Sequence, residues 1–488
     1  MKKQTQPKRT SKVIAIYTAG TFIRQLVGFV MLPIYTSYLG PADYGIISLL
    51  TLSISIFELV IGARFAQAIP RFYYEHDDEN LRKTVLSTSL IITAFFSSIG
   101  FVIIFSAQKP LAHLIFGDST LSIYLAIYGF LLFGSGIEYY GMTYLRLLER
   151  PYLFVFSSIA KLAVQLSLNI WLIVFLNKGV MGAIVSNITA SALFTVIFSS
   201  YILYQCGFRI DKTLIVRLFR FSWPLWLAGA AALYATSCNR FFIRIYAGLD
   251  DVGLFELANR LAMIVGLVIW QPFSQWWQTE RFKLLNNSTN KNFEFQRVFD
   301  FIAGFLFFSA TGVGILGDTV IKVMADSAFH LAAKALLPLT YASVFYCLGL
   351  FFNFWFLASD KTIKITYIKY INAILLTAIY LAFIPKGGFV GAAYGLLAAN
   401  VAIYGVTYLW SRHYLDIKIS TGFMYKALGL SVAACAIDIF SGLSSLSLGW
   451  SAIAKTSLCT IYTLTLALFF YMNKSTKESL QNLILRVR

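Results

Sequence analysis

Long apolar stretches fill this chain, and short polar loops separate them. The first stretch, from Val13 to Tyr38, is longer than the roughly 20 residues that a helix needs to cross a bilayer core. Thirteen similar stretches follow. The pattern predicts fourteen transmembrane helices over 13–38, 46–69, 84–107, 120–145, 151–176, 179–205, 222–247, 252–278, 298–321, 334–358, 362–384, 388–411, 424–441 and 450–472.

The composition excludes a soluble globule. Hydrophobic residues make up 58% of the 488 residues, charged residues only 13%, and the mean hydropathy is +0.71. An all-α polytopic membrane protein is predicted. The basic N-terminus precedes an apolar run too long for a signal peptide, so we expect a retained first span.

The positive charges predict the orientation of the helices. An even number of spans places both termini on one side, and the loops of that side hold 28 Lys and Arg residues against 5 in the opposite loops. Cytoplasmic loops carry the excess of basic residues. Both termini are therefore predicted in the cytoplasm, and the net charge of +18 needs no nucleic-acid partner.

Two halves of the chain share a spaced set of short motifs. The pairs lie 208 to 211 residues apart at equivalent loops: Gly40-Pro41-Ala42-Asp43-Tyr44-Gly45 with Gly248-Leu249-Asp250-Asp251-Val252-Gly253, Arg71-Phe72 with Arg281-Phe282, Glu149-Arg150 with Asp360-Lys361, and Gly179 to Ala183 with Gly388 to Ala392. We interpret the first pair as glycine turns in which Asp caps the next helix. A six-span parallel repeat is predicted.

The repeat divides the chain into four predicted parts. These are an N-terminal lobe of spans 1 to 6, a cytoplasmic linker with amphipathic helical spacing, a C-terminal lobe of spans 7 to 12, and two extra spans with a cytoplasmic tail, at 1–206, 207–221, 222–411 and 412–488.

Charged side chains inside the predicted spans are the main functional clue. Cations outnumber acids there, and a charge at that depth usually faces a cavity, a partner or a ligand. We predict a cavity between the two lobes that binds an anion. Its candidate cations are Arg24, Lys161, Arg260, Arg240 and Arg64. The candidate coupling or ion-pair acids are Glu58 and Glu138, and the candidate sugar contacts are Gln25, Gln165 and Asn169.

Structural explanations for the same residues remain open. Arg24 could pair with Glu58, Arg64 could extend to the cytoplasmic face, and Lys161 could bond to a helix break. Glu256 lies four residues before Arg260 and offers a local pair. The amides and indoles of 271–278 suit either sugar contacts or an aromatic belt at the membrane interface.

No catalytic or metal-binding motif is found. The five cysteines are far apart, and His76-Asp77-Asp78-Glu79 is interpreted as a solvated acidic run. We therefore expect neither an enzyme nor a metal site nor a cofactor. This weakens one alternative, a membrane polysaccharide polymerase or glycosyltransferase, which needs a nucleophile, base or metal.

Several motifs resemble those of a known family. Leu32-Pro33-Ile34-Tyr35, Tyr38-Leu39-Gly40-Pro41-Ala42-Asp43-Tyr44-Gly45, Arg71-Phe72-Tyr73 and Asp251-Val252-Gly253-Leu254-Phe255 look like those of the polysaccharide repeat-unit (Wzx-type) flippases of O-antigen, lipopolysaccharide and capsule assembly. These share a superfamily with multidrug extruders and the lipid II flippase. The lipid II flippase has an arginine-aspartate pair in its first span, whereas Gln25 follows Arg24 here.

The resemblance implies a carrier in the bacterial inner membrane. It would move an undecaprenyl-pyrophosphate-linked oligosaccharide outward by alternating access, with helices 1, 2, 7 and 8 around the cavity. Arg24, Arg64, Arg240 and Arg260 fall on those helices. The expected partners are the lipid-linked substrate, membrane lipids and other polysaccharide-assembly membrane proteins. The main alternative is a multidrug exporter, or an exporter of another lipid-linked precursor, of the same superfamily. A drug exporter would need acids for cationic drugs.

Overall fold

Helices form every regular element in the part of the chain that the structure describes. This computed structural model describes residues 31–60, 68–75, 78–288, 290–443 and 447–472. Within them, eleven helical segments are long and apolar enough to cross a membrane. The predicted all-α polytopic membrane fold is confirmed.

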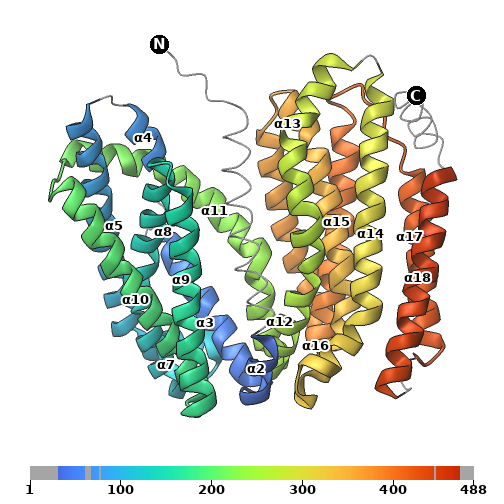
Figure 1. Cartoon of the computed structure of the whole chain (residues 1–488), viewed down its shortest axis with the longest axis horizontal. Helices are drawn as coiled ribbons and strands as arrows, with labels where there is room; N and C mark the ends of the chain where they lie inside the picture. The colour runs from blue at the N-terminus through green and yellow to red at the C-terminus, as the bar shows by residue number, and fades with distance from the viewer. Residues whose placement is uncertain (1–30, 61–67, 76–77, 289, 444–446, 473–488) are drawn as a thin grey trace. The chain divides into compact units, whose positions relative to one another are not determined.

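The chain divides into two compact units, residues 1–245 (unit 1) and 246–488 (unit 2). The helices of unit 1, coloured blue to green in Figure 1, are α2 (Leu32–Tyr38), α3 (Pro41–Val60), α4 (Ile69–Glu75), α5 (Glu79–Ser106), α6 (Gln108–Phe116), α7 (Ser122–Tyr128), α8 (Leu131–Leu147), α9 (Pro151–Asn169), α10 (Gly179–Cys206) and α11 (Lys212–Ala247), which ends just past the division. A 3-10 turn, η2 (Ser119–Leu121), precedes α7, and a π-helical turn, η3 (Ile170–Phe175), extends α9.

The helices of unit 2 are α12 (Leu249–Ala262), α13 (Gln271–Asn287), α14 (Lys291–Met324), α15 (Ala333–Ala358), α16 (Ile363–Ser411), α17 (Gly422–Phe440) and α18 (Leu448–Met472). A π-helical turn, η4 (Val265–Trp270), joins α12 to α13, and η5 (Ser327–Ala332) precedes α15. Helix α15 packs against α14 and α16. It carries many of the buried aromatic rings of this unit, among them Phe351, Phe354 and Trp355.

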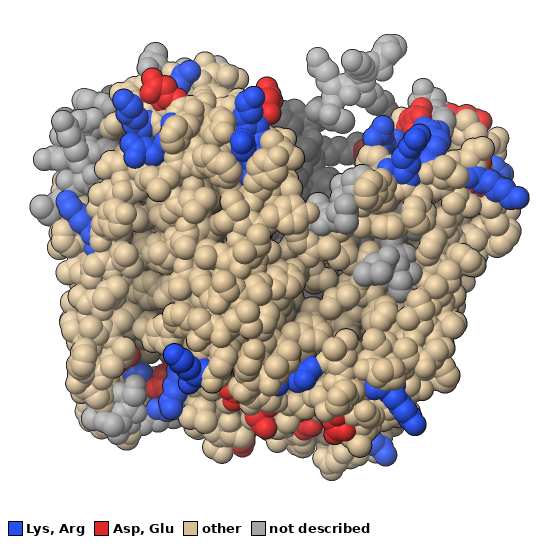
Figure 2. All heavy atoms as spheres, turned by 180° about the vertical axis from the view of Figure 1, so that it is seen from behind, with Lys and Arg blue, Asp and Glu red and all other residues tan. Residues whose placement is uncertain are grey.

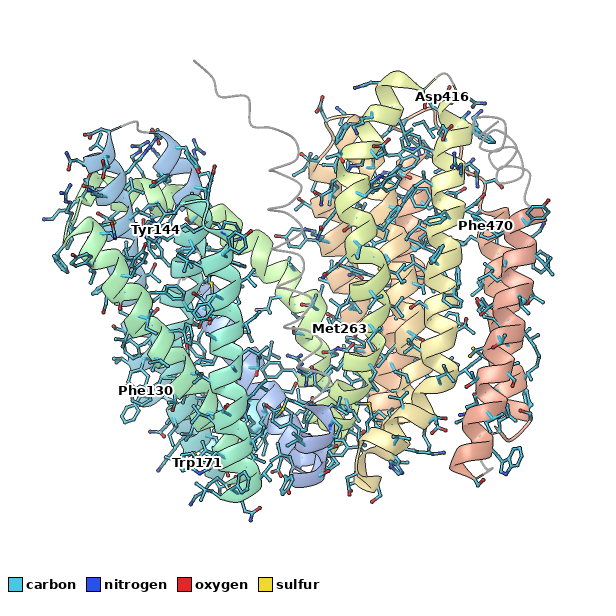
Figure 3. All side chains as sticks on the ribbon, in the orientation of Figure 1. Phe130, Tyr144, Trp171, Met263, Asp416 and Phe470 are labelled. Atoms are coloured by element: carbon cyan, nitrogen blue, oxygen red, sulfur yellow. The ribbon has the colours of Figure 1, made fainter. Side chains whose placement is uncertain are left out.

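Each unit has a surface that suits lipid. On the face seen in Figure 2, charged side chains gather toward the ends of the helices and leave a broad uncharged band between them. Large apolar side chains such as Phe130 and Trp171 lie on the outside of unit 1 with about half of their surface exposed (Figure 3). A bilayer core requires such an apolar exterior, because it offers no water to charged or polar groups.

Helix α16 holds two of the predicted spans. Its 49 residues would extend about 70 Å as one helix, more than twice the thickness of a bilayer core. The chain reverses at Gly388, where φ is +53° and ψ is −135°. The predicted spans 362–384 and 388–411 are therefore distinct, and Gly388 is the turn between them.

The motif after the first span is a helix start rather than a six-residue turn. Helix α3 already begins at Pro41, and the Asp43 carboxylate accepts a hydrogen bond from the Gly40 N–H at 3.1 Å. Asp43 therefore stabilises the start of α3 from its third position, as the acid of a capping box does, and not as the residue that precedes the helix. The equivalent Asp251 lies within α12, but its carboxylate accepts from the N–H of Phe389 instead, at 3.0 Å.

Backbone geometry at the end of the fourth and tenth spans supports the repeat. Glu149 and Asp360, which the predicted offset pairs, both have positive φ, at 52° and 56°. The residue after each, Arg150 or Lys361, donates its N–H to a carbonyl five residues back. This is the Schellman pattern of a helix C-terminus, usually built with glycine. Two acids in this rare conformation at matched positions indicate a shared origin of the two turns.

Helix α11 belongs largely to unit 1. It is continuous from Lys212, so residues 212–221 are the first part of α11, and an interfacial position for this part stays a prediction. The side chains of Leu214 and Leu218 are buried against Phe72 and Val85. The predicted division had placed 222–247 in the second lobe, and that division stays a prediction.

Candidate functional site

Two of the predicted site residues form an ion pair inside unit 1. The Lys161 ammonium on α9 lies 2.5 Å from Oε2 of Glu138 on α8, and the two side chains are only 21% and 16% exposed. Ser191 of α10 also donates to this carboxylate, at 3.4 Å. The carboxylate thus compensates the lysine charge, which explains how both are tolerated at this depth.

Glycine residues on α8 allow this arrangement. A Cβ atom built at Gly134 would lie 2.3 Å from the Ser191 hydroxyl, and one at Gly141 would lie 2.4 Å from the Phe198 ring. Small residues let membrane helices approach closely. Gly134 lies one turn before Glu138, so the close approach of α10 brings Ser191 within reach of the carboxylate.

Asn169 holds three helices together. Its amide donates to the hydroxyl of Tyr35 on α2 at 2.6 Å and accepts from Ser186 on α10, and its side chain is 2% exposed. In this structure Asn169 therefore has a packing role. Gln165 is half-buried one turn after Lys161, and its sugar contact stays a prediction.

The remaining predicted residues divide into two groups. Arg24, Gln25 and Arg64 lie outside the described residues. The second group is half-buried, and each of its side chains interacts with another group: Arg240, Arg260, Glu58 and Glu256. Roles in a cavity between the lobes stay predictions for all of them.

Arg244 has a structural role. Its guanidinium donates to the carbonyl of Ile115 at 2.8 Å and to the carbonyl of Leu114, at the end of α6. These carbonyls lie at the negative end of the helix dipole, where a cation is favourable. Arg244 ties α11 to α6 and is not available to a ligand in this structure.

Sequence reasoning missed a second buried ion network, in unit 2. Lys455 of α18 is fully buried and lies 3.0 Å from Asp318 of α14 and 3.9 Å from Asp438 of α17. Lys322 pairs with Asp318 as well, at 3.0 Å. The position of Lys455 inside the span 450–472 and the spacing of Asp318 and Lys322, four residues apart, were the sequence signals for this network. It fastens the two extra helices, α17 and α18, to α14.

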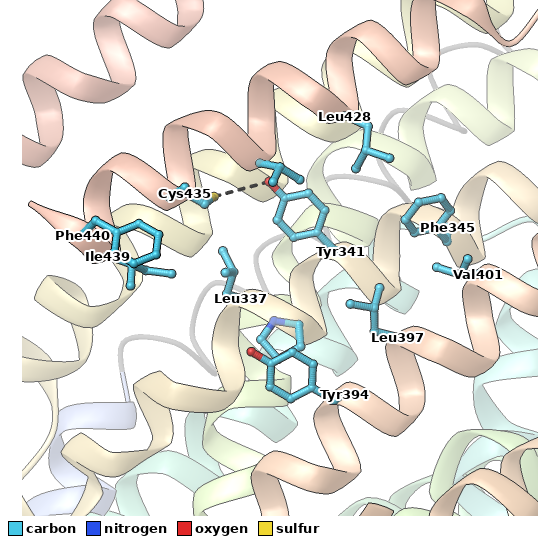
Figure 4. Close-up of a pocket in the computed structure, with 13 residues that line it drawn as sticks. Leu337, Tyr341, Phe345, Tyr394, Leu397, Val401, Leu428, Cys435, Ile439 and Phe440 are labelled. Carbon is cyan, nitrogen blue, oxygen red and sulfur yellow. Dashed lines mark hydrogen bonds between the residues drawn. The ribbon is translucent and has the colours of Figure 1, made fainter.

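A pocket in unit 2 is apolar over its whole lining. It is an open pocket of about 480 Å³ between α15, α16 and α17. Tyr341, Phe345, Leu397 and Ile439 point into it in Figure 4, and the Tyr341 hydroxyl is taken up by Cys435 at 3.4 Å. Such a lining suits a hydrocarbon chain rather than a polar solute.

The described residues contain no cluster of three or more His, Cys, Asp or Glu side chains that could hold a metal ion. The buried charges described above are compensated by groups of opposite charge, as a pair in unit 1 and as a network in unit 2.

Solved structures share the fold at low sequence identity. A lipid II flippase, MurJ, in an inward closed conformation is 13% identical with a TM-score of 0.77, over 94% of this chain and 99% of that one. An inward-facing multidrug resistance transporter of the MATE family is 16% identical with a TM-score of 0.63, over 80% and 94%. The MATE multidrug transporter DinF-BH is 18% identical with a TM-score of 0.58, over 87% and 98%.

Sequence comparison identifies the family. Lsg locus protein 1 of Haemophilus influenzae is 22% identical over 266 residues, which are 52% of this chain and 61%, less than two thirds, of that relative. The family model described as "Polysaccharide biosynthesis protein" matches residues 11–275, which is more than half of the chain. The chain therefore belongs to the polysaccharide biosynthesis protein family.

Proposed function

We propose that this protein is a flippase that moves a lipid-linked oligosaccharide across the bacterial cytoplasmic membrane. The observation that carries the proposal is the family match over residues 11–275. The likeness in fold to a lipid II flippase, over 94% of the chain, supports it. We further propose undecaprenyl pyrophosphate as the lipid carrier, with the chain oriented so that both termini are cytoplasmic.

A substrate of this class has three chemically distinct parts, and the described residues offer groups for two of them. The apolar pocket between α15, α16 and α17 suits part of the polyprenyl chain. Lys161 suits a phosphate oxygen, because an ammonium binds an anion strongly where water is scarce. Contacts with the sugars are proposed for Gln25 and Gln165.

We propose that the headgroup phosphate competes with Glu138 for Lys161. In the absence of substrate Glu138 compensates the lysine, at 2.5 Å. When the phosphate binds, it pairs with the Lys161 ammonium in place of Glu138. The Glu138 carboxylate then accepts a hydrogen bond from the Ser191 hydroxyl or becomes protonated. Arg24, Arg64, Arg240 and Arg260 are proposed to bind the same anion, and Glu58 to compensate one of them.

The direction of transport follows from the charge of the headgroup. A membrane potential that is negative inside favours outward movement of an anion by roughly 2.3 kcal/mol per charge per 100 mV. The field therefore assists export as long as the loaded carrier keeps a net negative charge.

Export of cationic drugs is the second candidate, because transporters of the MATE family share the fold. A drug exporter needs an acid that is free to meet a cation. In unit 1 the pairing of Glu138 with Lys161 favours the anionic substrate.

Reconstitution into liposomes tests the proposal. Proteoliposomes that contain fluorescent undecaprenyl-diphosphate-oligosaccharide should show protein-dependent loss of inner-leaflet probe, and Lys161→Met should slow it at least about tenfold. Lys178→Met, which changes an exposed lysine, is the matched control and should flip normally. Equal rates with and without protein, or transport of a cationic dye instead, would overturn the assignment.

A further inference from the structure

An aromatic cluster surrounds Trp277 on α13. The loop charges predict that this end of the helix is cytoplasmic. Trp277 is 2% exposed, and its indole stacks on Phe351 of α15 with 5.0 Å between ring centroids. Phe295 and Phe354 pack around it. The residue is therefore part of the core of unit 2 and not of an aromatic belt, in contrast to its exposed neighbour Trp276.

Two hydrogen-bond donors in this cluster have no acceptor among the described residues. They are the indole Nε1–H of Trp277 and the guanidinium Nε–H of Arg281, and both atoms are buried. The two residues are four apart in α13, so they lie on one face, one turn from each other. Buried donors are nearly always paired in native proteins, and two orphans on adjacent turns indicate a missing acceptor.

The positive charge of Arg281 is also uncompensated. Within the described residues no carboxylate lies within ion-pair distance of it, and the adjacent acid, Glu280, binds Lys283 at 3.2 Å. The Arg281 guanidinium instead packs over the rings of Phe282 and Phe354, 5.4 and 5.1 Å from their centroids. The rings fix its position and leave its buried Nε–H without an acceptor.

We propose that Trp277 and Arg281 form a phosphate-binding site at this end of unit 2. A phosphate supplies several acceptor oxygens and a negative charge, which are what the two donors and the guanidinium lack. A neutral acceptor such as water could pair with the donors but would leave the charge uncompensated.

The site lies at the predicted depth of lipid headgroups in the cytoplasmic leaflet. The phosphate can therefore belong to the diphosphate of the lipid-linked substrate, to a phospholipid, or to a soluble phosphate. The first source rests on the proposed function and would make this a loading site. The other two do not depend on it.

The repeat supplies a matched control. Arg71 is the equivalent of Arg281, and its guanidinium packs over Phe72 and Phe221, at 6.0 and 4.7 Å. Arg71, however, is exposed, whereas Arg281 is half-buried and its Nε–H is buried, so water satisfies the donors of Arg71 and screens its charge more fully. A site that depends on enclosure should lose phosphate binding with Arg281 and keep it with Arg71.

Binding can be measured as ligand-induced thermal stabilisation of the full-length protein in detergent. The probes are undecaprenyl diphosphate, phosphatidylglycerol and inorganic pyrophosphate, with undecaprenol and diacylglycerol as phosphate-free counterparts. We expect at least one phosphate probe to raise the unfolding temperature of the wild-type protein, and the phosphate-free lipids not to raise it. Arg281→Gln should weaken its apparent affinity about tenfold, and Arg71→Gln should leave it unchanged.

Trp277→Phe provides an independent measure, because it keeps an aromatic ring in the stack and removes the N–H together with part of the indole. It should weaken the apparent affinity for the same probe about threefold. This measurement remains possible even if Arg281→Gln does not fold. The probe that binds identifies the source of the phosphate. If no phosphate probe depends on Arg281 or Trp277, the site does not exist. Phosphate binding with no flipping would leave the site standing and refute only the proposed function.

Discussion

Gly388 provides a sharp test of the packing in unit 2. It lies at the reversal in α16 with φ +53° and ψ −135°, a conformation that side chains other than glycine rarely adopt. A Cβ atom at this position would lie 2.3 Å from Oδ2 of Asp251, the atom that accepts the Phe389 N–H. Gly388→Ala therefore strains the backbone and displaces the carboxylate.

The two effects can be separated with the repeat. Backbone strain of this kind costs about 1–3 kcal/mol, and a lost hydrogen bond to a carboxylate about 1.5–3 kcal/mol more. Gly179 has nearly the same φ, +52°, but nothing lies within 4 Å of its Cβ position. Gly179→Ala should cost about 1–2 kcal/mol. The difference of about 2 kcal/mol or more corresponds to roughly 4 °C or more in a domain of this size.

The assay is thermal unfolding of the purified variants in detergent, followed by tryptophan fluorescence. We expect Gly388→Ala to unfold at a clearly lower temperature than Gly179→Ala. The double variant Gly388→Ala with Asp251→Ala should be no less stable than Gly388→Ala, because the second change removes the clashing atom. Equal unfolding temperatures for the two glycine variants would refute the reasoning.

Three further predictions concern single residues. Lys161→Met should cost about 3 kcal/mol or more because it leaves Glu138 unpaired, whereas adding Glu138→Gln should restore most of that stability in the same thermal assay; an additive loss would contradict the ion pair. Hydrogen bonds from Thr213 hold the pKa of Asp211 below its ordinary value of 3.8, so this carboxylate stabilises the start of α11 at neutral pH and loses its effect as the pH falls through that lowered value. Asp211→Ala should therefore cost about 1 kcal/mol near pH 7, with a difference from wild type that shrinks below about pH 4; a difference that does not change with pH would argue against it. Arg24→Ala should abolish flipping in proteoliposomes without reducing membrane insertion, and normal transport would remove Arg24 from the proposed site.

Local patterns sufficed for much of the fold. The length of the apolar stretches predicted the helices, because a bilayer core sets how many residues a span needs. The repeat was visible because its turns use special residues: Gly179 and Gly388 both have positive φ. Asp43 caps α3 through a residue three positions away, a contact that sequence spacing can predict.

The candidate site was only partly predictable. Lys161 and Glu138 were both recognised as charges at depth, but spacing along the chain could not show that they face each other. Asp318 was not recognised because its partner Lys455 lies 137 positions away, and Asp438 was not recognised because its partner lies on the next helix, whose facing side the spacing does not give. Asp251 copies Asp43 in the repeat and yet bonds to Phe389, 138 positions along.

The sequence by itself thus determined an all-α polytopic membrane protein, and it predicted an internal repeat and an excess of cations at depth. These properties follow from hydrophobic length, loop charge and backbone rules, which act over a few residues. Only the tertiary structure decided which buried charges are paired and which donors, such as those of Trp277 and Arg281, are not. Hydrogen bonds and ion pairs act over a few ångströms, so they depend on which helix faces pack together.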